Sequence, residues 1–173
     1  YVMLDVSVRK WLIKQSYEKI QEYLEQKDSI KLIDYLNSHS AKIAGTAIGV
    51  LIRRTDFWNV VNEILTNNLL TDRLSKICFL NGVYVFGKKN PNTIKAALHF
   101  LYDKNKEVAS QALFGIVFYN DPKYIPTVKE CRDTSCSPGT EAYHDFSLAL
   151  RALEEGKPSL YSPYFFDADK VWE

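Results

Sequence analysis

The sequence contains few residues that break helices or cross-link a chain. Its 173 residues include only 7 Gly, 6 Pro and 3 Cys. Three is an odd number of cysteines, and a reduced chain is the simpler expectation, although a disulfide across the short segment between Cys131 and Cys136 stays open. These two cysteines have no His nearby in sequence, so we expect no metal site.

An excess of charge is absent too. The chain has 22 Lys and Arg against 21 Asp and Glu, a net charge of +1. A surface built entirely for nucleic acid usually has a basic excess, so nucleic acid is not the expected partner. The sequence also has no apolar run near the ~20 residues of a membrane span. Since no signal peptide is visible, we expect a cytoplasmic protein that does not contact a membrane.

What the sequence does contain is typical of a soluble globular protein. Hydrophobic residues make up 46% and charged residues 25%. A chain of this length can bury a real core. We therefore predict one domain over residues 1–173, with residues 158–173 as an irregular tail.

The most informative stretch is Lys104–Thr127. It contains an apolar face at helical spacing, formed by Val108, Ala109, Ala112, Leu113, Ile116 and Val117. The run stops at Asn120-Asp121-Pro122, where Asp can cap a new helix and Pro can occupy its first turn. The stretch predicts a helix, a tight corner and a second helix.

This pattern recurs along the chain. A shift of 65 residues places similar residues at Leu36, Ile43, Ala44, Ala47, Asp56 and Val60. A weaker copy, Leu74–Pro91, begins about halfway between the two. Repeats of this length indicate units that must stack, because one helix pair cannot bury its apolar face alone.

These residues resemble a known family. Val108-Ala109, Ala112-Leu113, Gly115-Ile116, Asp121-Pro122 and Ile125-Pro126 look like the second-helix pattern of HEAT-like (armadillo-type) repeats. The resemblance is good over Thr93–Arg132, fair over Ser29–Leu65 and weak over Thr71–Pro91. It implies an all-α fold, a short right-handed solenoid of antiparallel helix pairs with about nine or ten helices. A non-repetitive helical bundle is the alternative.

The expected helices follow from apolar periodicity and cap residues. They are Val8–Gln26, Ile30–Asn37, Ala41–Arg54, Phe57–Asn67, 72–87, Thr93–Tyr102, Lys106–Tyr119, Pro122–Arg132 and Glu141–Glu155. Asp133–Thr140 is rich in Ser, Pro and Gly and is predicted as a loop. The tail holds five aromatic residues that we expect to cap the solenoid, or alternatively to bind a partner: Tyr161, Tyr164, Phe165, Phe166 and Trp172.

Two groups of HEAT-like enzymes were compared with the sequence. The di-iron hydroxylases use His-Glu pairs, and none of His39, His99 and His144 precedes a Glu. DNA glycosylases of this build use Trp, Asp and Arg around the lesion, and the segment Arg53–Trp58 contains these residue types. A simpler explanation is that the arginines favour a helix C-terminus and Asp56 caps the next helix.

No phosphate-binding Gly loop or Gly-x-Ser-x-Gly elbow is present. We therefore expect no catalytic residue and no cofactor, and predict a protein that is not an enzyme.

Solenoids bind partners through successive second helices and their corners. The residues expected there are Arg53, Arg54, Trp58, Tyr84, Lys88, Lys89, Tyr119, Tyr124, Glu154 and Glu155. We predict a protein-binding function, in the form of an immunity protein that neutralises a bacterial toxin, and favour a monomer. The alternatives are a scaffold or assembly factor in a larger complex and, less favoured, a nucleic-acid-binding protein or DNA glycosylase.

Overall fold

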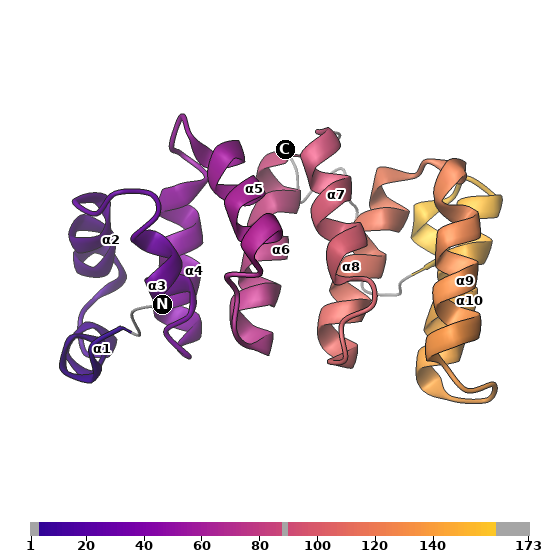
Figure 1. Ribbon diagram of the computed structural model, residues 1–173, viewed down its shortest axis with the longest axis horizontal. Coiled ribbons are helices and arrows are strands. Elements are labelled where there is room, and N and C mark those ends of the chain that lie inside the picture. The colour runs from indigo at the N-terminus through magenta and orange to yellow at the C-terminus, as the bar shows by residue number, and fades with distance from the viewer. Residues whose placement is uncertain (1–3, 88–89, 162–173) are drawn as a thin grey trace. The chain divides into compact units, whose positions relative to one another are not determined.

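The computed structural model describes residues 4–87 and 90–161, and helices joined by turns and loops make up this part of the chain (Figure 1). It has ten α-helices and no strand within these ranges, which confirms the all-α prediction. The α-helices are α1 (Val6–Ile13), α2 (Tyr17–Glu25), α3 (Leu32–Leu36), α4 (Ala41–Leu51), α5 (Phe57–Asn67), α6 (Arg73–Gly87), α7 (Pro91–Phe100), α8 (Lys106–Tyr119), α9 (Ile125–Ser135) and α10 (Glu141–Glu154). Two 3₁₀ turns, Pro122–Tyr124 and Pro158–Leu160, complete the described elements.

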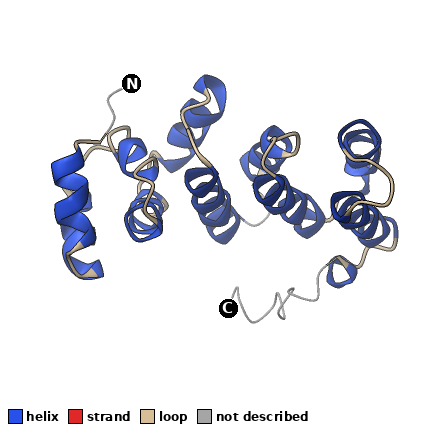
Figure 2. Cartoon of the chain, turned by 90° about the horizontal axis from the view of Figure 1, so that it is seen from below, coloured by secondary structure: helices blue, strands red, loops and turns tan. Residues whose placement is uncertain are grey.

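The chain divides into two compact units, Tyr1–Phe86 and Gly87–Glu173. We call them unit 1 and unit 2 and describe each by itself. Figure 2 shows several helices of each unit end-on, so that the neighbours of a helix within its unit can be followed. The single domain and the solenoid running through the whole chain stay predictions.

In unit 1, α4 is the central helix. It packs against α1, α2 and α3. Its buried face includes Ala44 and Ala47, both fully buried, as expected for small residues that allow close helix packing. At Gly82 of α6 the approach to α4 is so close that an added Cβ would overlap the side chain of Ile48. Small residues therefore set the distance between α4 and its neighbours.

Buried polar contacts join successive parts of unit 1. The side-chain amide of Asn37 donates to the carbonyl of Leu69 at 2.8 Å, and its oxygen accepts from the backbone N–H of Thr71 at 2.9 Å. The hydroxyl of Ser29 donates to Asp56 Oδ1 at 2.8 Å. Asp56 begins α5, but its side chain makes no cap bond, so the predicted capping role is wrong. Its carboxylate is bound by Ser29 instead.

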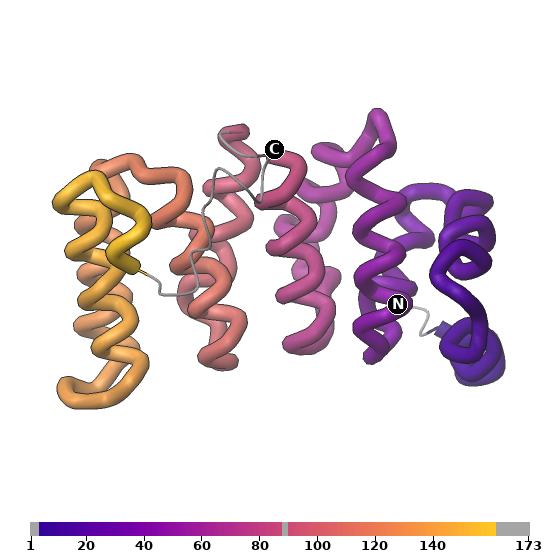
Figure 3. Tube along the Cα trace, turned by 180° about the vertical axis from the view of Figure 1, so that it is seen from behind, coloured from indigo at the N-terminus to yellow at the C-terminus, as the bar shows by residue number. Residues whose placement is uncertain are grey.

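Unit 2 is built from two helix pairs. The helices α7 and α8 lie side by side (Figures 1 and 3), and α10 packs against both α8 and α9. The predicted helix Lys106–Tyr119 is found with these same bounds. Its expected apolar face is buried, except that Ala109 is only half-buried. The periodicity of this stretch therefore identified a core helix correctly.

The corner after α8 also follows the prediction. Asn120 has a φ of 53°, in the left-handed region that ends many helices. Asp121 then accepts a hydrogen bond from the backbone N–H of Lys123 at 3.0 Å. The predicted helix from Pro122 begins as a 3₁₀ turn and continues as α9, which extends to Ser135 and so shortens the loop expected from Asp133. Gly156, with a φ of 63°, follows the end of α10.

The helix order is compatible with a helical repeat. The helices α4, α6, α8 and α10 begin at residues 41, 73, 106 and 141, at intervals of 32, 33 and 35 residues. The helices that precede them, α5, α7 and α9, begin at residues 57, 91 and 125. This regular alternation supports the repeat expected from the sequence, and the HEAT resemblance itself stays a prediction.

The predicted helix Val8–Gln26 is wrong, because two helices occupy this range. The first ends at Ile13, and Ser16 begins the second by accepting a hydrogen bond from the N–H of Lys19 at 3.3 Å. Apolar residues on both sides of Ser16 gave one continuous pattern and hid this cap. Trp11, on the first of these two helices, is 48% exposed.

Two further predictions concern the cysteines and the tail. All three cysteines have free thiols, so the possible Cys131–Cys136 disulfide is absent. Cys131 is buried in α9, which raises the pKa of its thiol, and its Sγ lies 3.6 Å from the carbonyl oxygen of Leu101. In the tail, Tyr161 is half-buried, whereas Tyr164, Phe165, Phe166 and Trp172 lie outside the described residues.

Among the described residues, no helix has both the length and the apolarity that crossing a membrane requires.

Candidate functional site

The two arginines predicted at the end of α4 have different environments. Arg54 donates from Nη2 to the carbonyl oxygens of Glu25 and Lys27, both at 2.9 Å. It therefore binds carbonyl groups at the C-terminal end of α2, a neighbouring helix, rather than the end of its own helix. Arg53 forms an ion pair with the carboxylate of Glu25 at 3.0 Å, and about half of each side chain is exposed.

The predicted aromatic residues of unit 1 are less accessible than expected. Tyr84 is only 2% exposed, so its place among the exposed binding residues is wrong. It lies on the face of α6 that points into the core. Trp58 is half-buried and packs against Phe57 and Phe86, with ring centroids 4.9 and 5.8 Å away. Lys88 and Lys89 lie outside the described residues.

In unit 2, two predicted aromatic residues meet at the corner after α8. The rings of Tyr119 and Tyr124 are 6.2 Å apart in an edge-on arrangement, and the ammonium of Lys123 lies 4.9 Å from the Tyr124 ring. Both tyrosines are half-buried. The structure therefore brings these two predicted residues together, as it does Arg53 and Arg54 in unit 1.

The acidic pair at the end of α10 is exposed and partly neutralised. Arg151 donates to the Glu155 carboxylate at 2.8 Å, one turn away, and Lys157 lies 3.6 Å from it. The hydrogen bond from Arg151 is the main reason that the pKa of Glu155 is lowered. The unfavourable position of Glu155 at a helix C-terminus is therefore offset by two neighbouring cations.

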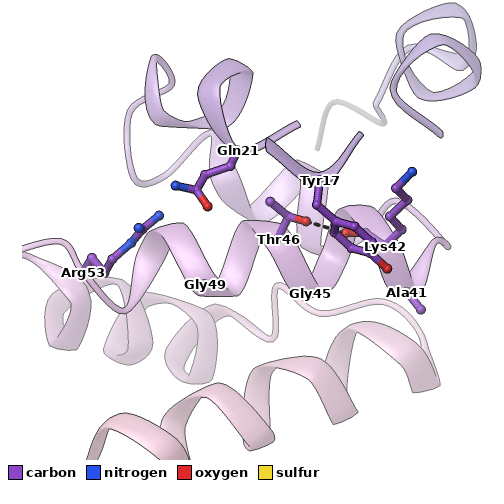
Figure 4. A pocket seen from close by; sticks show the side chains of 8 residues that line it. All are labelled: Tyr17, Gln21, Ala41, Lys42, Gly45, Thr46, Gly49 and Arg53. Carbon is purple, nitrogen blue, oxygen red and sulfur yellow. Dashed lines mark hydrogen bonds between the residues drawn. The ribbon is translucent and has the colours of Figure 1, made fainter. Parts of the chain in front are cut away.

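A groove is present on the surface of unit 1. It lies between α2 and α4 and has a volume of about 580 Å³ (Figure 4). Its lining consists of Tyr17, Gln21, Ala41, Lys42, Gly45, Thr46, Gly49 and Arg53. Figure 4 shows the α2 side chains on one side, with Lys42 and Arg53 toward opposite ends of α4. Only Arg53 belongs also to the residues predicted from the sequence.

Three small residues on α4 form the floor of this groove. Ala41, Gly45 and Gly49 follow each other at intervals of four residues, so they lie along one face of the helix. A Cβ added to Gly45 or Gly49 would meet no other atom within 4 Å. Neither glycine has a positive φ. Packing and backbone conformation therefore give no reason for glycine at either position.

One rim of the groove carries Tyr17, and its side chain is largely free. Tyr17 is 63% exposed, and the ammonium of Lys42 lies 5.1 Å from its ring centroid. Lys42 also donates to the backbone carbonyls of Gln15 and Ile13, which anchor it to the α1–α2 connection. Ile13 is itself 42% exposed. This end of the groove thus combines an exposed aromatic ring with a positive charge.

The opposite end is formed by a polar network. The amide of Gln21 donates to Glu25 Oε1 at 2.9 Å, and Arg53 donates to the same oxygen at 3.0 Å. Along α4, Arg53 is eleven residues from Lys42, a distance of about 16 Å at the rise of an α-helix. The groove therefore extends over about three helical turns.

The groove has residue types that are common in contact surfaces. Tyr and Arg are enriched at the energetic centres of protein interfaces. The described residues contain no group of three or more His, Cys, Asp or Glu side chains placed to hold a metal. The chemistry available in the groove is apolar contact, hydrogen bonding and charge.

Sequence reasoning missed the groove because it used the small residues of α4 only as core residues. The signal was present in the four-residue spacing of Ala41, Gly45 and Gly49. Ala44 and Ala47, on the same helix, are buried. The sequence pattern alone did not show which set of small residues would face α2 and solvent.

Comparison of the chain with known protein families, with curated proteins and with solved structures found no match. The resemblance to HEAT-like repeats therefore rests on the residues of this sequence and on the helix order.

Proposed function

We propose that this chain binds another protein and that the groove between α2 and α4 is part of the contact surface. The observation that carries the proposal is the pair Gly45, which is exposed, and Gly49, which is half-buried, because packing within unit 1 requires glycine at neither position. A glycine in a helix costs about 1 kcal/mol relative to alanine. Without side chains at these positions, the backbone of α4 is open to close approach by atoms of a partner.

The rim of the groove supports a protein as the partner. An interface needs a few large side chains that are accessible before binding and become buried in the complex. Tyr17 meets this condition, and Arg53 and Gln21 supply polar contacts at the other end. Since Glu25 already neutralises Arg53, the groove does not depend on a highly charged ligand.

The nucleic-acid alternative has weaker support. In unit 1 it would rely on Arg53 and Arg54, and both side chains are bonded within this unit. Each arginine could contact a phosphate group only after releasing the acceptor that it binds in unit 1. Arg54 would have to give up two carbonyl acceptors on α2.

The narrower proposal is that the partner is a toxin domain and the chain its immunity protein. It is supported by the size of the chain and by the resemblance to compact helical repeats, and no single residue is diagnostic. It predicts a stoichiometric complex with a toxin encoded beside the gene for this chain, and loss of toxin activity on binding. A chain recovered only inside a larger multisubunit assembly would favour the scaffold alternative instead.

Site-specific photocrosslinking tests the binding surface directly. A photoreactive phenylalanine is placed at Tyr17, and the full-length chain is irradiated in the cells that produce it. Tyr102 of unit 2 is a matched control, because it is also a tyrosine with at least half of its surface exposed. We expect a discrete adduct with one protein from position 17 and none from position 102. No adduct from position 17, or the same adducts from both positions, would contradict the proposal.

A pair of substitutions tests the role of the glycines. Gly49→Gln adds a long side chain over the groove floor in a residue type that favours helix, so the fold should be retained. When the partner identified by crosslinking is titrated with Gly49→Gln, we expect an affinity at least tenfold lower than that of the unmodified chain. Glu63→Gln is a control on an exposed position of α5, outside the groove lining, and should bind as the unmodified chain does. Equal affinity of both variants would remove the groove from the interface.

A further inference from the structure

We draw no further inference here: the strongest candidate, the groove between α2 and α4 with its floor of Ala41, Gly45 and Gly49, belongs to the site already described, and nothing in the structure shows which element of a partner covers it.

Discussion

The two sides of α4 use small residues for opposite reasons. On the buried side, Ala44 and Ala47 are fully covered, and Gly82 of α6 meets the α4 residue Ile48 without room for a Cβ. On the side toward the groove, Gly45 and Gly49 have open space where a Cβ would be. The residue types are the same, and only the surroundings separate a packing role from a surface role.

The comparison teaches how to recognise a candidate surface in a helix. A small residue that is crowded is explained by the fold, because a larger one would cause overlap. A helical glycine with open space lowers stability and is not explained by packing. The second kind marks a position where the reason for glycine has to be sought outside the chain. Substitutions at five positions in and around α4 test this distinction and the contacts beside it.

The largest effect is expected at Gly82, on the crowded side. Gly82→Val should lower the free energy of unfolding by about 2–3 kcal/mol, because the new side chain overlaps Ile48. Urea denaturation of the full-length chain measures the change. Gly82→Val should cause a smaller loss of unfolding free energy in an Ile48→Ala variant than in the unmodified chain. If Gly82→Val leaves the free energy of unfolding unchanged, α4 and α6 do not approach each other as closely as described.

A smaller loss of unfolding free energy is expected from substitution of Arg54. This residue lies just after α4 and donates to carbonyl groups at the C-terminal end of α2. Arg54→Ala removes two hydrogen bonds to the carbonyls of Glu25 and Lys27, and hydrogen bonds from charged groups contribute about 1.5–3 kcal/mol. Since the site is partly exposed, we expect a loss of about 1.5–2 kcal/mol, at the low end of that range. Arg54→Lys keeps the charge, but the lysine side chain is shorter and lacks the planar guanidinium, so it should restore only part of the loss. Full restoration by Lys would show that the charge alone matters.

The opposite sign is expected on the groove side of α4. Gly45→Ala and Gly49→Ala should each raise the free energy of unfolding by up to about 1 kcal/mol, because alanine favours helix and has room for its Cβ. Thermal and urea denaturation of the two single variants and the double variant provide the measurement. Destabilisation by either change would mean that the glycine has a role within the fold.

The smallest effect on stability is expected at Arg53. Its ion pair with Glu25 is about half-exposed, and such pairs contribute about 0–1 kcal/mol. Arg53→Ala should therefore change the urea midpoint little while weakening binding to the crosslinked partner. Raising the salt concentration should reduce even this small stability difference. A loss as large as that of Arg54→Ala would contradict the distinction between the two arginines.

Most of the fold of unit 2 followed from local pattern. The helix Lys106–Tyr119 was predicted with its observed bounds, and the corner at Asn120 and Asp121 was recognised from its cap residues. These features depend on interactions between residues a few positions apart, which a sequence displays directly. In unit 1 the same reasoning failed at Ser16, because the apolar residues before and after the cap formed one plausible helical face.

The candidate site was predicted much less well. Tyr84 was expected on the surface and is buried, and Asp56 was expected to cap α5 and is bound by Ser29, 27 residues earlier in the chain. Among the predicted binding residues that the structure describes, Arg53 alone lines the groove. Each of these outcomes depends on which elements pack together. Local sequence patterns contain little information about such long-range contacts.

The sequence by itself determined that the chain is helical, where most of its helices begin and end, and that small residues recur on some of them. These properties follow from backbone propensity, capping and periodicity, all of which act within one or two turns. The tertiary structure alone decided which small residues became core and which became the floor of a groove. That choice depends on the burial of apolar surface between distant segments, since α4 can turn only one of its faces toward the core.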